Sequence, residues 1–284
     1  MIIIQIRRPL LIILMFVVAI SFIITNNTKN DEELNDKIIT IQGVVKGKIE
    51  KKRYNQYKVG VFLINDYTKN KNLKIGQKVN ITGKFKSLDK MKYDDFDYGR
   101  YIKSTGYKGI VYINNYKIID KNKLYSLIGE IKFYISKTYR YLYKKNSDFI
   151  NSILLAEVEN LTEEQKEIFT RTGTSHVISI SGLHTGILCV IISFLLRGIN
   201  KLYKLLILSI FITLYCIMVG ASPSIIRSIA FVMIFYLSIF IDRKKDGISA
   251  LSLIGIILIM NNPYVIYNVS FQLSFLATLS ILIV

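Results

Sequence analysis

Five long apolar runs dominate the C-terminal part of the sequence and constrain its fold more than any other feature. They cover residues 177–196, 202–219, 225–241, 248–260 and 269–284. A membrane-spanning helix needs roughly 20 mostly apolar residues, and each run is near that length, the fourth being the shortest. We therefore predict that residues 175–284 form an α-helical polytopic membrane bundle of about five helices.

Another apolar run, residues 10–24, follows Arg7 and Arg8. The TNNTKN stretch after it lacks the small-residue pattern of a signal cleavage site, so residues 1–30 are predicted to be an uncleaved membrane anchor. Basic segments are retained on the cytoplasmic side, which places the N-terminus and the loops after the first and third runs in the cytoplasm. The region between anchor and bundle is then extracytoplasmic, and the protein a multi-pass protein of the cell membrane.

Residues 31–122 have the alternating pattern of β-strands. The segments are IITIQGVV, YKVGVFLI, KVNITGKF and YKGIVYI, with a short fifth strand, YKII, after an Asn114–Asn115 turn. A helix capped by Asp94 or Asp95 and ended by Gly106 is predicted between the third and fourth strands. Three strands, a helix and two strands is the element order of an OB-fold barrel, a fold that often binds single-stranded nucleic acid. We therefore expect an OB-like β-barrel domain.

The positive charge of the chain is concentrated in the same region. Residues 26–149 contain about 27 Lys and Arg against about 13 Asp and Glu. Part of this excess fits a bias toward residues with AT-rich codons, but Glu, which shares that bias, is scarce here. A basic surface favours a polyanionic partner. Lys51, Lys52 and Arg53, near the first hairpin, are the candidate DNA-phosphate contacts, although a solvated loop has the same composition. The many tyrosines of the region fit strand packing as well as base stacking.

Residues 123–174 are predicted to be amphipathic and connecting helices. Leu124, Ile128, Ile131, Ile135 and Leu142 recur at helical spacing among lysines and tyrosines. Such a helix can lie on an anionic membrane surface or pack on the barrel, and the sequence leaves both open. Ser147 is the predicted cap of the next helix. Thr162 and Gln165 have the spacing of a capping box, and Gly173 is expected to end that helix.

A few polar residues stand inside the apolar runs, where an unpaired polar group is costly. The stretch GTSHVISISGLHTGIL, residues 173–188, contains both histidines of the chain, His176 and His184, and also Ser181. Arg227 and Gln272 lie in later runs. These side chains are expected to face the interior of the bundle. Gly182 and Gly186 have the spacing that lets another helix approach closely.

The same residues give little support to catalysis. His176 and His184 are eight residues apart, about 12 Å along a helix, which is too far to share one metal ion. Ser181 has the S-G context of an intramembrane hydrolase, but none of the later apolar runs contains a histidine that could act as its base. Cys189 and Cys216 both lie in apolar runs and fit small buried side chains. We therefore expect no enzyme activity and no cofactor, and an intramembrane hydrolase is the least favoured function.

Four stretches together resemble a known family. GTSHVISISGLHTGIL is similar to the signature of the ComEC-type DNA-uptake channel proteins. GASPSIIRSIAF and YNVSFQLSFLATLSIL resemble two further motifs of that family, the latter with Ser280 in place of a usual glycine. FDYGRYIKSTG resembles the helix that closes the family's OB-like external domain.

The resemblance implies import of single-stranded DNA across the cell membrane during natural transformation. It also implies path-lining or bundle-organising roles for the residues that match the motifs, namely Ser175, His176, Ser181, Gly182, His184, Gly186, Arg227 and Gln272. Expected partners are single-stranded DNA, membrane lipids, a surface DNA receptor, a cytoplasmic DNA translocase and a second copy of the chain. Many members continue into a metallo-β-lactamase-like domain, so we expect this chain to be an incomplete fragment of the family pattern. The alternative is a surface-anchored OB-type protein that binds nucleic acid or another polyanion without transporting it.

Overall fold

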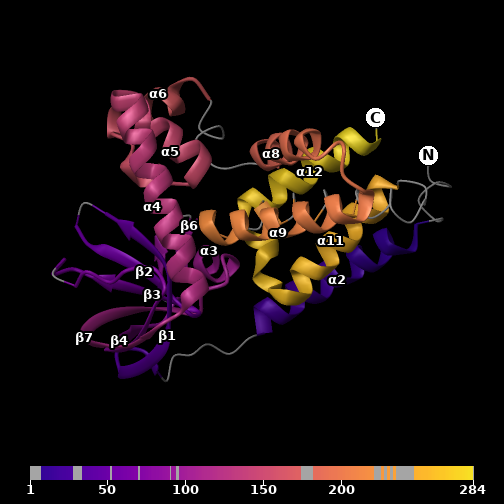
Figure 1. Cartoon of the computed structure of the whole chain (residues 1–284). Coiled ribbons are helices and arrows are strands. Elements are labelled where there is room, and N and C mark those ends of the chain that lie inside the picture. The colour runs from indigo at the N-terminus through magenta and orange to yellow at the C-terminus, as the bar shows by residue number, and fades with distance from the viewer. Residues whose placement is uncertain are drawn as a thin grey trace. The chain divides into compact units, whose positions relative to one another are not determined.

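The computed structural model describes residues 8–27, 34–51, 53–69, 71–89, 91–93, 96–173, 182–220, 225–226, 229–230, 233–234 and 246–283. The chain divides into two compact units, whose elements are labelled in Figure 1. The barrel unit consists of Lys29–Ile180 with Met218–Gly220. The apolar unit consists of Met1–Thr28, Ser181–Ile217 and Ala221–Val284.

A closed barrel of five strands forms the centre of the barrel unit. The strands are β1 (Ile38–Glu50), β2 (Asn55–Val59), β3 (Phe62–Asp66), β4 (Gln77–Lys86) and β7 (Gly109–Lys121). Around the barrel the order is β1, β2, β3, β7 and β4, with β3 and β7 parallel and the other pairs antiparallel. Because β7 pairs with both β3 and β4, the sheet closes and no long edge is left unpaired. The predicted β-barrel is confirmed.

The route of the chain through the barrel differs from the predicted order. The run YKVGVFLI is a hairpin rather than one strand, because Gly60 adopts a φ of +59° and turns the chain between β2 and β3. β7 continues through Asn114 and Asn115, where the sequence predicts a turn. The helix therefore follows four strands and precedes one. Two short strands with matching alternation have the pattern of a single long strand, which is why the sequence misleads here.

The helix between β4 and β7 closes one part of the barrel. A short ribbon of β5 (Lys92–Tyr93) and β6 (Phe96–Asp97) leads into α3 (Tyr98–Ser104). Its N-cap is Asp97, whose carboxylate accepts a hydrogen bond from the Arg100 N–H at 2.8 Å; Asp94 and Asp95, the predicted caps, lie outside the described residues. Gly106 follows the helix with a φ of +91°, as predicted. The side chain of Ile102 packs with Leu63, Leu88, Met91 and Ile110.

Three α-helices and two short 3-10 helices complete the described part of the barrel unit. They are α4 (Lys123–Tyr143), η2 (Lys144–Asn146), α5 (Ser147–Leu155), η3 (Val158–Asn160) and α6 (Glu163–Arg171). One side of α4 packs on the barrel: a Cβ added at Gly129 would lie 3.1 Å from Cβ of Ile75, and the Asn122 N–H donates to the Gly76 carbonyl at 2.7 Å. Packing on the barrel, one of the two alternatives for this helix, is therefore confirmed. Another side of α4 stays exposed, and contact of that side with lipid stays a prediction.

The predicted N-cap is confirmed for α6 and is wrong for α5. Thr162 and Gln165 form the predicted capping box of α6, with both reciprocal hydrogen bonds present. Ser147 is not the cap of α5. The cap residue is Asn146, and the Ser147 hydroxyl instead donates to the Lys144 carbonyl at 2.6 Å, because the preceding 3-10 turn brings that carbonyl within reach.

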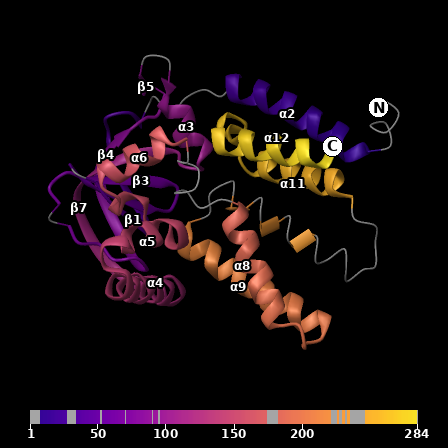
Figure 2. The same cartoon turned by 90° about the horizontal axis from the view of Figure 1, so that it is seen from above.

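The described helices of the apolar unit are α2 (Pro9–Asn27), α8 (Gly182–Leu195), α9 (Lys201–Val219), α11 (Gly247–Asn261), the short η4 (Pro263–Tyr267) and α12 (Val269–Ile283). Figures 1 and 2 show α2 alongside α11, and residues of α2, α11, η4 and α12 share one apolar cluster. Within this group the Ser21 hydroxyl donates to the Pro263 carbonyl at 2.7 Å. Thr25 Oγ1 and Tyr267 Oη lie 2.9 Å apart, so short polar side chains join α2 to η4.

Two of the described helices are long and apolar enough to cross a membrane, α2 and α9. The apolar helices α8, α11 and α12 are shorter. Most of the third predicted run, residues 225–241, lies outside the described residues. One of the five predicted bundle helices therefore reaches a spanning length in the described part of the chain, and a bundle of five stays a prediction.

Candidate nucleic-acid interface

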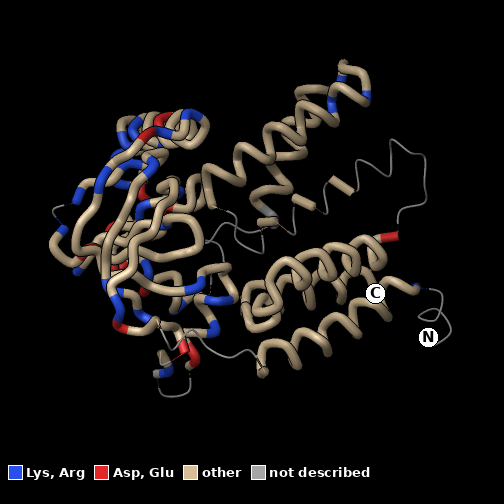
Figure 3. The backbone as a smooth tube through the Cα atoms, turned by 90° about the horizontal axis from the view of Figure 1, so that it is seen from below, with Lys and Arg blue, Asp and Glu red and all other residues tan. Residues whose placement is uncertain are grey.

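Lysine and arginine gather on the barrel unit, whereas the described apolar helices carry them at few positions (Figure 3). Some of these cations are already committed to the fold. Lys103 pairs with Asp89 at 2.6 Å and Lys84 with Asp36 at 3.0 Å. Lys71 donates to the carbonyls of Ile113 and Asn114 at 3.0 and 2.7 Å. The cations that are free to bind a polyanion are those without such contacts.

The loop between β1 and β2 holds the three cations predicted to contact DNA. Lys51 is fixed by Tyr54: its Nζ donates to the tyrosine hydroxyl at 3.2 Å and lies 5.2 Å from the centre of the ring. Burial alone would lower the pKa of Lys51, but the Tyr54 hydroxyl and nearby Glu159 raise it, so the side chain stays charged. Arg53 is exposed, and Lys52 lies outside the described residues. Phosphate contact by these residues stays a prediction.

A row of tyrosines begins beside that loop. The ring of Tyr67 lies 4.8 Å from the ring of Tyr54 and 5.8 Å from that of Tyr112. Tyr67 is 56% exposed, so one ring of the row is open to a stacking base. Tyr57, in contrast, is fully buried and donates its hydroxyl to the Lys71 carbonyl, which is a packing role. The sequence gives no means of separating these two tyrosines, which lie ten residues apart.

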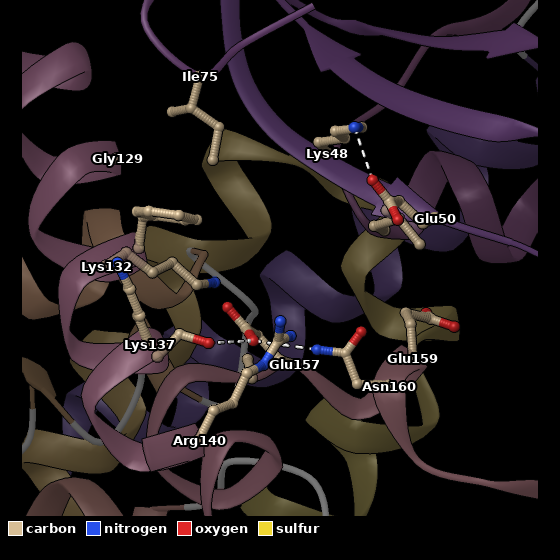
Figure 4. Close-up of a pocket in the computed structure, with 14 residues that line it drawn as sticks. Lys48, Glu50, Ile75, Gly129, Lys132, Lys137, Arg140, Glu157, Glu159 and Asn160 are labelled. Carbon is tan, nitrogen blue, oxygen red and sulfur yellow. Dashed lines mark hydrogen bonds and ion pairs between the residues drawn. The ribbon is translucent and has the colours of Figure 1, made fainter. Parts of the chain in front are cut away.

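A highly charged hollow of the barrel unit lies where β1, α4 and η3 meet (Figure 4). This charged cleft has a volume of about 530 Å³. Its ionisable lining residues are Lys48, Glu50, Lys132, Lys137, Arg140, Glu157 and Glu159. Lys48 and Glu50 form an ion pair at 2.6 Å. Lys132, Ser136 and Arg140 come from successive turns of α4, and Figure 4 shows Lys132 and Arg140 extending toward Glu157.

Hydrogen bonds fix the far wall of the charged cleft. The Glu157 carboxylate accepts from the Ser136 hydroxyl at 3.0 Å and from the Asn160 amide at 3.1 Å. The Asn151 amide donates to the same serine hydroxyl at 3.1 Å. Ser136 is 6% exposed and Asn151 is fully buried. This network joins α4, α5 and η3, so one serine hydroxyl helps to set the position of the cleft's central carboxylate.

A second hollow, of about 820 Å³, shares Lys48, Glu50 and Phe133 with the charged cleft. It continues along the junction of α4 and the barrel to Ser126 and Lys121. From Ser126 to Arg140 the two hollows follow about 21 Å of α4, at 1.5 Å per residue. An elongated depression of this kind suits a linear chain better than a small rounded ligand.

Four of the residues matched to family motifs lie outside the described residues: Ser175, His176, Ser181 and Arg227. Gly182 begins α8, and His184 lies partly buried in its first turn. Among the described residues no atom comes within 4 Å of a Cβ built at Gly186. The close helix contact expected there is not seen in this part of the chain, and the roles of these residues stay predictions.

Close helix contacts among the described residues occur on α11, at Gly247, where a Cβ would lie 2.6 Å from Leu282 Cδ2 of α12, and at Gly255. A Cβ at Gly255 would lie 2.9 Å from Leu14 Cδ1 of α2 and 3.1 Å from Phe275 Cε1 of α12. Gln272 has a clear partner as well, because its amide donates to the Ile266 carbonyl at 2.7 Å and so ties α12 to η4. The sequence feature that indicates the contact at Gly255 is a glycine inside an apolar run. The four-residue glycine spacing singles out Gly186 in the sequence and not Gly255, which has Leu251 and Ile259 at the corresponding positions.

Known proteins with similar sequences point to one family. Residues 153–284 match the family model described as "Competence protein". The chain is 26% identical over 165 residues to ComE operon protein 3 of Bacillus subtilis (strain 168), which is 57% of this chain and 21% of that protein. It is 31% identical over 126 residues to an uncharacterized protein of Aquifex aeolicus (strain VF5), covering 44% of this chain and 30% of the relative. The chain thus spans less than a third of the length of either relative.

The solved structures add nothing to this assignment. An aspartyl tRNA synthetase from Entamoeba histolytica is 11% identical, covers 59% of this chain and 36% of its own, and gives a TM-score of 0.24. That likeness is too small to bear on fold or function. The family match covers α6 and the apolar unit from α8 onward and contains the motifs at residues 173–188, 220–231 and 267–282. Over residues 153–284, the chain therefore matches the competence protein family.

Proposed function

We propose that this protein is a membrane component of the machinery that imports single-stranded DNA during natural transformation. The observation that carries the proposal is the match of residues 153–284 to the competence family. In this proposal the apolar unit lies in the cell membrane and contributes to the path of the strand. The barrel unit lies outside the cytoplasm and contacts the strand before it enters the membrane, and the protein has no enzymatic role.

The division of charge between the two units supports this arrangement. The described barrel unit carries most of the lysines and arginines, an exposed tyrosine ring and an elongated charged depression (Figure 3). The described apolar unit has two helices of spanning length and few charges. Basic grooves with stacking aromatics are the usual means of holding single strands without sequence preference. A long external domain can carry excess positive charge, because such domains cross the membrane largely regardless of charge.

Deletion of the gene in cells that are competent for transformation tests the proposal. The measurements are the amount of labelled DNA bound at the cell surface and the amount that becomes resistant to added nuclease. We expect surface binding to persist and the nuclease-resistant fraction to disappear, with recovery when the gene is supplied in trans. Unchanged entry of DNA in the deletion strain would refute the proposal.

A surface-anchored DNA-binding protein without transport activity is the second candidate, because most of the described cations and the tyrosine row with Tyr67 belong to the barrel unit. A version of the gene that lacks residues 202–284 but keeps α2 and residues 29–180 separates the two functions. An anchored binding protein keeps its full activity after this deletion. A transport component keeps DNA at the surface and loses entry.

A further inference from the structure

The cations of the charged cleft are not neutralised by their surroundings. Lys132, Lys137 and Arg140 form no ion pair with any carboxylate in the described part of the chain. Lys58 of β2 stands close to this group, since its charge acts on Lys132. Within the cleft Glu157 is held by two neutral donors, Ser136 and Asn160, rather than by a cation.

Counting charges around the cleft leaves a positive surplus. The lining cations are Lys48, Lys132, Lys137 and Arg140, and the lining carboxylates are Glu50, Glu157 and Glu159; Lys58 of β2 is not a lining residue, but its charge acts on Lys132 and is counted with them. Lys48 and Glu50 cancel each other as an ion pair. The remaining four cations face two carboxylates, so two positive charges are left over. A phosphate ester carries between one and two negative charges near pH 7, which matches this surplus.

Two of the lysines are partly withdrawn from water. Burial lowers the pKa of Lys132; Glu157 opposes this effect and Lys58 adds to it. Burial also lowers the pKa of Lys58, with Glu159 acting in the opposite direction. Gly47 contributes to this arrangement, because a Cβ there would lie 3.2 Å from Cδ of Lys58, so the lysine stem occupies the space that glycine leaves on β1. Two partly buried cations that repel each other gain stability from an anion placed between them.

We propose that the charged cleft binds a phosphate group, with Lys132 and Arg140 as its principal ligands and Lys58 and Lys137 as supporting charges. Lys132 and Arg140 lie two turns apart on α4, one turn on either side of Ser136, so they approach the cleft from both ends of its carboxylate network. The identification of the phosphate with the backbone of an incoming single strand rests on the proposed function. The phosphate site itself rests on the cleft.

The test uses the full chain in detergent micelles and a fluorescein-labelled oligothymidylate, whose anisotropy is measured at 50 and 200 mM salt. The double variant Lys132→Gln, Arg140→Gln removes the two principal ligands. The control Lys78→Gln, Lys117→Gln removes the same charge from exposed positions on β4 and β7 outside the cleft. We expect the cleft variant to bind at least about tenfold more weakly at 50 mM salt. Loss of two phosphate contacts lowers the dependence of log K on log salt by about 1.4. The control is expected to lose much less, and Lys132→Arg to retain most of the affinity.

Titration of inorganic phosphate by calorimetry tests the phosphate site separately from the claim that its phosphate belongs to DNA. If the wild type binds phosphate and the cleft variant does not, the phosphate site is supported, even if no version binds the oligonucleotide. In that last case the proposed contact of the barrel unit with DNA is refuted, and the phosphate site is not. Equal loss of oligonucleotide affinity in the cleft variant and the control, with unchanged phosphate binding, overturns the inference and leaves the proposed function standing. Absence of both kinds of binding in the wild type overturns the inference as well. Circular dichroism of each variant confirms that the fold is retained.

Discussion

Replacing Ser136 by alanine tests the network that supports the charged cleft. The hydroxyl of Ser136 donates to the Glu157 carboxylate at 3.0 Å and accepts from the Asn151 amide at 3.1 Å, and both bonds join α4 to other segments. The variant removes both hydrogen bonds at once, in a region with little access to water. Among the described residues, the Glu157 carboxylate then keeps only the hydrogen bond from the Asn160 amide.

The size of the effect follows from what is left unpaired. Asn151 is fully buried, and its Oδ1 already has no hydrogen-bond partner among the described residues. Leaving its amide unpaired as well costs about 1–3 kcal/mol, and losing a hydrogen bond to a charged carboxylate costs about 1.5–3 kcal/mol. Since the two terms overlap in one small network, we expect Ser136→Ala to destabilise the docking of α5 and η3 on α4 by about 3 kcal/mol. That corresponds to roughly a 150-fold increase in the population of the undocked state.

Amide hydrogen exchange of the full chain, followed by mass spectrometry, measures this opening. Peptides from α5 and η3 should exchange about 150 times faster in Ser136→Ala, whereas peptides from β4 should keep their wild-type rate. Ser152→Ala is the matched control: Ser152 is equally buried on α5, but its hydroxyl donates only to the Phe149 carbonyl of its own helix, at 2.7 Å. We expect that variant to lose about 1 kcal/mol or less. Equal exchange rates in the two variants would refute the idea that Ser136 holds the wall of the cleft.

Three further predictions concern other parts of the chain. Lys132→Met should raise the unfolding temperature at pH 7, because burial lowers the pKa of Lys132 and the charged lysine therefore destabilises the folded state. The gain in unfolding temperature should shrink as pH approaches 10.5, because the wild-type lysine loses its proton at a lower pH in the folded than in the unfolded state. A gain that does not change with pH would contradict this. Gly255→Val should destabilise the apolar unit by about 1–3 kcal/mol and lower the unfolding temperature by a few degrees, while Gly186→Val, with open space at Cβ among the described residues, should not. Tyr67→Ala should weaken oligonucleotide binding by about 1–3 kcal/mol in an anisotropy titration, whereas Tyr141→Ala on α4, also exposed, should leave it unchanged.

The barrel could be predicted from sequence because alternation of apolar residues is a local property that each strand shows by itself. The order of its elements could not. The turn at Gly60 depends on a φ of +59°, and the run around it alternates as one strand does. The straight passage of β7 through Asn114–Asn115 depends on pairing with β4, a contact made by residues about 30 positions away. Local signals that act within one helix, such as the Thr162–Gln165 capping box, were sufficient on their own.

The charged cleft, like the order of the barrel strands, depends on contacts between residues far apart in the sequence. The loop cations Lys51, Lys52 and Arg53 stand out in the sequence because they are consecutive. The cleft cations do not, because Lys58 and Lys132 are more than 70 residues apart and meet only when α4 packs on the barrel. Gly129 allows that packing through its close contact with Ile75, and Gly47 leaves room on the barrel for the stem of Lys58. The sequence therefore predicts that this region is basic, and the fold decides which of its cations lie together without a carboxylate partner.

Exposure and pairing together decide which basic residues can bind a polyanion. A cation already paired, such as Lys103 with Asp89, has to break that bond before it holds a phosphate, and the gain from the new contact is reduced accordingly. A fully solvated cation contributes mainly a salt-dependent attraction, which is similar at every exposed lysine of the surface. Lys132 lies between these cases: it is partly desolvated, it is not paired within the described residues, and it faces a second lysine. Phosphate binding at such a position relieves an existing repulsion as well as forming a new contact, so the site is expected to retain more of its affinity at high salt than the exposed lysines around it.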